Sequence, residues 1–62
     1  MIELTRLNNS QIMINCDLIE TVEENPDTVI TLTTGKKFVV KESRQDIRNL
    51  VISYKQKIMK FE

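Results

Sequence analysis

A chain of 62 residues has room for one small domain, and its single cysteine and lack of histidine exclude an internal disulfide and a standard structural zinc site. Nine basic and nine acidic residues give a formal net charge of zero, although the acids dominate up to Glu42 and the bases dominate from Ser43 onward. Because so short a domain buries only about 60% of the surface of its unfolded chain, its stability is marginal and association with another chain is favoured.

The first fifteen residues predict a β-hairpin. Residues 2–5 alternate apolar and polar side chains, with the two-residue period of a half-buried strand. The Asn-Asn-Ser segment at residues 8–10 provides asparagines, which tolerate the left-handed backbone conformation of tight turns. Residues 11–15 then predict a second strand, in which Met13 points away from the face shared by its isoleucine neighbours.

Three more strands are predicted before residue 42. Residues 18–24 contain glutamates that mildly favour a helix, but their β-branched residues and the Asn-Pro-Asp turn after them favour a strand. Residues 28–33 alternate clearly and are rich in β-branched side chains. Gly35, the only glycine, stands where a positive φ angle is expected, and residues 37–41 complete the set.

The last third of the chain predicts a helix over residues 44–60. Ser43 and Asp46 form a variant of the capping box that starts helices. No glycine or proline interrupts this stretch, and lysines near its end suit the helix dipole. One apolar stripe runs along the helix, widened by Leu50 and made of Ile47, Val51, Tyr54, Ile58 and Phe61.

These elements predict a single α+β domain over residues 1–62, a five-stranded antiparallel meander sheet covered by one C-terminal amphipathic helix. The covered face is expected to carry Ile2, Leu4, Ile12, Ile14, Ile30, Leu32, Phe38 and Val40. Five apolar residues remain off that face or off the helix stripe, and they are the candidate interface: Val29, Val39, Ile52, Met59 and Met13. Their number on so small a body predicts a homo-oligomer, most simply a dimer; the alternative is a compact monomer whose sheet curls enough to bury both faces.

The residue types needed for catalysis are scarce. Without histidine there is no Ser-His or Cys-His pair, and one glycine cannot supply a phosphate-binding loop. The acidic residues from Glu20 to Asp27 lack the spacing of a calcium loop, so we predict no enzyme activity, metal or cofactor. Cys16 is expected to be a buried structural thiol. With no signal peptide and no membrane span recognised, the chain is expected in a reducing cytoplasm.

Nucleic acid is the main alternative partner. The basic residues of the predicted helix could follow a phosphate backbone, as in a small RNA-binding regulator. However, the three aromatic residues Phe38, Tyr54 and Phe61 all fall at expected core positions, which leaves none for stacking on bases. The sequence therefore disfavours nucleic acid as a partner. The sequence disfavours a membrane surface as well, because the apolar stripe of the helix is expected to pack on the sheet and is then not free to enter a membrane.

Four segments of the chain resemble the FlbD-like family of small flagellar proteins, also known as the SwrD swarming motility family. They are MIELTRLN at residues 1–8, DLIETVEE at 17–24, PDTVITL at 26–32 and GKKFVVKES at 35–43. The resemblance implies a role in bacterial flagellar motility, with no catalytic residue and no cofactor. It also implies a protein partner at the cytoplasmic side of the flagellar basal body or motor, whose identity the sequence does not give.

Overall fold

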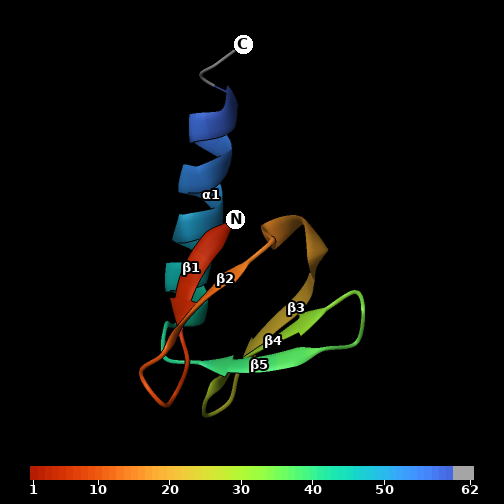
Figure 1. Ribbon diagram of the computed structural model, residues 1–62, viewed down its shortest axis with the longest axis vertical. Coiled ribbons are helices and arrows are strands. Elements are labelled where there is room, and N and C mark those ends of the chain that lie inside the picture. Colours follow the sequence, from red (N-terminus) through yellow and green to blue (C-terminus); the bar gives the residue numbers. More distant parts are fainter. Residues whose placement is uncertain (60–62) are drawn as a thin grey trace.

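The computed structural model describes residues 1–59 and has an α+β fold with five strands and one C-terminal helix (Figure 1). Each predicted strand is present and the predicted helix is present as far as Met59, while Lys60, where the predicted helix ends, and Phe61, the last residue of its apolar stripe, lie outside the described part. The elements in chain order are β1 (Ile2–Thr5), β2 (Gln11–Ile14), the 3₁₀-helix η1 (Cys16–Leu18), β3 (Ile19–Glu24), β4 (Thr28–Leu32), β5 (Lys37–Val40) and α1 (Arg44–Met59).

The prediction of one five-stranded meander sheet is wrong. The strands form two antiparallel sheets, a two-stranded sheet β1-β2 and a three-stranded sheet β3-β4-β5. The meander required β2 to pair with β3, but η1 turns the chain between them. The Asn15 side chain accepts a hydrogen bond from the Asp17 amide at 3.0 Å, and the Leu18 amide donates to the Asn15 carbonyl at 3.0 Å. Such local bonds compete with strand pairing, so β3 leaves the first hairpin.

The two sheets meet where β1 and β5 end. Arg6 and Val40 form an isolated antiparallel bridge, and the Lys41 amide donates to the Thr5 carbonyl at 2.8 Å. The Glu42 carboxylate accepts a hydrogen bond from the Thr5 amide, at 2.8 Å to one oxygen and 3.0 Å to the other. Burial acts to raise the pKa of Glu42, but the hydrogen bonds from Thr5 outweigh it and hold that pKa below its ordinary value.

The turns have the predicted chemistry. Asn9 has φ of 70° and Gly35 has φ of 91°, so both residues occupy the left-handed region that asparagine and glycine tolerate. In the first hairpin the Asn8 side chain accepts from the Ser10 amide at 3.0 Å, which closes the turn. The Asn25–Pro26 peptide bond is cis, in the turn between β3 and β4.

The core is made of the inward face of both sheets and the start of α1. It contains Ile2, Leu4, Ile14, Cys16, Ile30, Leu32, Val40 and Ile47, with Ile12 and Phe38 half-buried against it. The predicted sheet face is therefore confirmed, residue by residue, although two sheets supply it. The prediction that Cys16 is buried is confirmed as well.

The helix covers less of this face than the sequence predicted. Ile47 is buried and Val51 and Tyr54 pack half-buried against the core, but Ile58 is 48% exposed and Leu50 is 38% exposed. A helix of 16 residues is about 24 Å long, whereas strands of four to six residues span only about 13–20 Å. The second half of α1 therefore extends beyond the strands, which Figure 1 shows.

Candidate functional site

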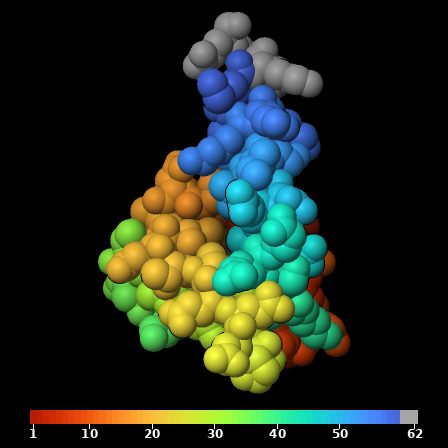
Figure 2. Space-filling view, turned by 180° about the vertical axis from the view of Figure 1, so that it is seen from behind, coloured from red at the N-terminus to blue at the C-terminus, as the bar shows by residue number. Residues whose placement is uncertain are grey.

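An open groove of about 510 Å³ lies between α1 and the segment formed by η1 and β3. Figure 2 views the molecule from the side on which these two parts of the chain lie next to each other. The groove is lined mostly by apolar side chains, with two arginines among them: Cys16, Ile19, Val22, Ile47, Val51, Ile52, Arg44 and Arg48. Its volume lies within the range of about 300–1,000 Å³ that is typical of ligand pockets.

An irregularity in β3 shapes one wall of the groove. In a regular strand Ile19 and Val22 would point to opposite faces, because they are three residues apart. The register of β3 against β4 shifts between Ile19 and Thr21, as at a β-bulge. Both side chains consequently pack against the core and line the same groove. The shift therefore brings two apolar side chains of β3 to the groove.

The other wall is the first half of α1, whose start is fixed by two sets of hydrogen bonds. The Ser43 hydroxyl accepts from the Asp46 amide at 3.0 Å, and the Asp46 carboxylate accepts from the Ser43 amide at 3.1 Å, which confirms the predicted capping box. The Glu24 carboxylate at the end of β3 accepts from the Arg44 amide at 2.8 Å. The start of the helix is thereby tied to β3.

Two guanidinium groups on the helix wall have no ionic partner among the described residues. Arg44 and Arg48 are both exposed and lie one helical turn apart, so their side chains share one side of α1. Among residues 1–59, neither guanidinium has a carboxylate oxygen within 4.0 Å. The nearby acids Glu24 and Asp46 are engaged by backbone amides. The helix wall therefore presents positive charge beside the apolar floor of the groove, which is formed by Cys16, Ile19, Val22, Ile47 and Val51.

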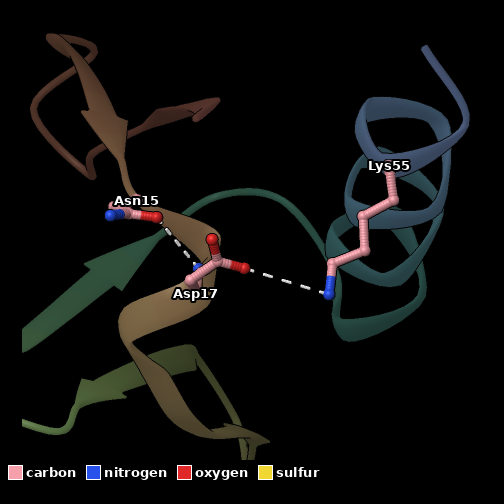
Figure 3. A network of polar contacts seen from close by, with 3 residues as sticks. All are labelled: Asn15, Asp17 and Lys55. Atoms are coloured by element: carbon pink, nitrogen blue, oxygen red, sulfur yellow. Dashed lines mark hydrogen bonds and ion pairs between the residues drawn. The ribbon is translucent and has the colours of Figure 1, made fainter. Parts of the chain in front are cut away.

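A weak ion pair connects η1 with the middle of α1. The Lys55 Nζ lies 3.9 Å from the Asp17 Oδ1, and Asn15 holds the Asp17 amide (Figure 3). The two charged side chains are 59% and 71% exposed, so solvent screens the attraction and it contributes little to stability.

The five residues of the candidate interface lie in three places. Ile52 lines the groove, and Met59 is exposed seven residues further along the same flank of α1. Val29 and Val39 are cross-strand neighbours on β4 and β5, where Val29 is half-buried and Val39 exposed. Met13 is exposed on β2, in the other sheet. The structure does not gather the five into one patch, and their role as an interface stays a prediction.

Other kinds of site have little support in the described residues. Over residues 1–59 no group of three or more His, Cys, Asp or Glu side chains is arranged to hold a metal ion. In the same range no helix has the length and apolar character needed to cross a membrane. Phe38 is half-buried with the Arg6 guanidinium 5.7 Å from its ring centre, and Tyr54 packs half-buried against the core. Neither ring is a free platform for stacking on a base.

Comparison with protein families finds a match that covers residues 1–59. The matching family is FlbD, described as flagellar and swarming motility proteins. The chain belongs to the FlbD family. The family predicted from the four sequence segments is thus confirmed, and a role in flagellar or swarming motility follows from membership. Comparison with curated proteins and with solved structures finds no match.

For most residues that line the groove of this FlbD family member, the sequence did not predict a place in a binding site. Of its lining residues, only Ile52 was a candidate for an interface. Ile19 and Val22 were missed because the register shift that brings them together has no clear sequence signal. Arg44 and Arg48 carried a signal, since two arginines four residues apart on a predicted helix share one face.

Proposed function

We propose that this FlbD family protein is a non-catalytic motility factor that works through contacts with other proteins, at the cytoplasmic side of the flagellar basal body or motor. Family membership supports the flagellar role. The groove between α1 and β3 supports the mode of action and is the docking surface in this proposal. The scarcity of catalytic residue types in the sequence supports the non-catalytic part of the proposal.

The observation that carries the proposal is the apolar floor of the groove. Apolar side chains that stay accessible on a small protein cost free energy in water, and a concave, mostly apolar surface with a few polar groups is the usual form of a binding site. In this chain Ile19, Val22 and Val51 are only half-buried, and all three line the groove. A partner that inserts its own apolar side chains would remove this surface from water.

An RNA-binding regulator of flagellar genes is the competing function, and the groove favours it less. Arginines that contact phosphates need no apolar floor beside them, whereas single-stranded RNA is usually held by exposed aromatic rings. The half-buried state of Phe38 and Tyr54 leaves these two rings poorly placed for that purpose.

A deletion strain separates the two functions. We expect the strain to keep its flagellar filaments and its flagellar protein levels but to lose swimming or swarming speed, and to recover when the gene is restored. The purified protein should bind flagellar transcripts no more tightly than unrelated RNA. Altered flagellar protein levels, together with transcript binding that weakens steeply between ~50 and ~200 mM salt, would establish the RNA-binding function instead.

We also propose that the chain forms a homo-oligomer, most simply a dimer. Exposed apolar side chains remain away from the groove, on Val39 and Met13, and burying each in a contact between copies contributes about 1.5–3 kcal/mol. A contact between two copies of the β4–β5 surface around Val29 and Val39 would leave the groove free for another protein.

A further inference from the structure

We infer that the groove binds an apolar segment of another protein whose carboxylates pair with Arg44 and Arg48. The inference rests on the proposed function and specifies the chemistry of the partner. Two observations carry it: the apolar floor and the two guanidinium groups beside it.

The guanidinium groups specify the charge of the partner segment. Arginine forms planar, bidentate hydrogen bonds with carboxylates, and these bonds strengthen where an apolar surface excludes water. Neither Arg44 nor Arg48 pairs with a carboxylate in residues 1–59, and the nearby Glu24 and Asp46 carboxylates accept from backbone amides. A partner that brings apolar side chains and an Asp or Glu would satisfy both the floor and the arginines.

A second copy of the chain fits the groove less well than another protein. The apolar element of this chain that projects from the body is the second half of α1, with exposed Ile58 and Met59. That part of the helix also carries Lys55 and Lys57, which would meet Arg44 and Arg48 with like charge. Charge complementarity therefore points to a different, acidic partner.

The first experiment reverses the charge of the groove. A deletion strain is complemented with the R44E/R48E variant and, as a matched control, with K36E/K57E, which changes the net charge equally at two exposed lysines outside the groove. We expect R44E/R48E to leave swimming speed at the level of the deletion strain and K36E/K57E to restore it. Urea unfolding of both purified variants shows whether they fold. A folded R44E/R48E protein that restores full speed overturns the inference.

The second experiment reads the chemistry of the partner directly. A photo-crosslinking amino acid is placed at Ile52 in the groove, or at Ile58 outside it as a control, in cells that express the full chain. We expect the Ile52 probe to give a cross-linked peptide that holds apolar residues next to Asp or Glu, with a yield that falls about tenfold or more in the R44E/R48E background. A basic or uncharged peptide, RNA, or a second copy of this chain at that position overturns the inference.

These results separate failure of the inference from failure of the proposed function. A deletion strain that moves normally contradicts the proposed function itself. A deletion strain that moves poorly, and is fully restored by folded R44E/R48E, leaves the motility role intact and removes only the acidic partner segment.

Discussion

Replacing Glu42 by alanine should weaken the contact between the two sheets at the place where β1 meets β5. The Glu42 carboxylate is the acceptor for the Thr5 amide, with both oxygens within 3.0 Å, and it lies in the sequence between β5 and α1. Removing it leaves a part-buried amide without its partner. Leaving such a donor unsatisfied costs about 1–3 kcal/mol.

That loss is large for this chain. At about 0.05–0.15 kcal/mol per residue, a domain of this size has about 3–9 kcal/mol of total stability. With a urea m-value near the lower end of the usual ~1–3 kcal/mol/M, the midpoint of unfolding should fall by about 1 M or more. Glu42→Gln keeps an acceptor oxygen but loses the charge, so it should lie between wild type and Glu42→Ala.

The pH dependence of the same contact has a defined sign. Because the pKa of Glu42 is lower in the folded protein than its ordinary value of 4.5, the contact stabilises the fold fully above that value. The contribution is lost as the pH falls below 4.5 and through the folded pKa. The difference between wild type and Glu42→Ala should therefore shrink in acid.

Urea unfolding followed by circular dichroism at pH 7 and at pH 3 measures both effects. Glu23→Gln is the control, because Glu23 is exposed and accepts no hydrogen bond from a described side chain or loop amide. A Glu42→Ala protein with the same midpoint as Glu23→Gln at pH 7 would refute the reasoning.

Three further predictions concern the helix and the oligomer. Ser43→Ala removes the capping box and should lower the free energy of unfolding in urea by about 1 kcal/mol, whereas Ser53→Ala, in the exposed middle of α1, should leave it unchanged. Equal effects of the two substitutions would contradict the cap. Ile47→Ala leaves a cavity at a buried position and should lower the free energy of unfolding by about 2–5 kcal/mol, while Ile58→Ala should lower it by less than about 1 kcal/mol. The reverse order would mean that the end of the helix is covered. Sedimentation at micromolar concentration should give a mass above the 7.3 kDa of one chain, and Val39→Asp should lower that mass. A mass that stays at the value of one chain as the concentration rises would rule out the dimer.

Local sequence patterns predicted the elements well. The asparagine turn at residue 9, the glycine at residue 35 and the Ser43–Asp46 box each depend on residues close together in the chain, and all three have the predicted form. The alternating strands likewise identified which side chains face the core, because that periodicity does not depend on which strand is the neighbour.

Pairing between distant strands was not predictable in the same way. Whether β2 pairs with β3 depends on a short turn around Asn15, and the bridge between Arg6 and Val40 joins residues far apart in sequence. The reach of the helix over the sheet depends on strand lengths and on their positions after this rearrangement. The exposure of Ile58 could therefore not be derived from the helical period alone.

The groove combines both difficulties. Its apolar floor depends on the register shift that puts Ile19 and Val22 on one side of β3. The two arginines of its basic wall could be recognised from their spacing of one helical turn. The sequence did not indicate that the nearby Glu24 and Asp46 carboxylates would accept hydrogen bonds from backbone amides and leave the arginines without an ion pair.

The central claim, that the groove is the surface through which this FlbD family protein supports motility, is tested most directly by filling it. Ile52→Trp adds bulk at a position that is partly exposed, so the fold should tolerate it, and Ile58→Trp adds the same bulk on the same helix outside the groove. The measurement is the swimming speed of the deletion strain complemented by each variant, with urea midpoints of the purified proteins alongside. We predict that Ile52→Trp folds normally and leaves the strain as slow as the deletion, while Ile58→Trp restores wild-type speed. Full speed with folded Ile52→Trp would contradict the claim.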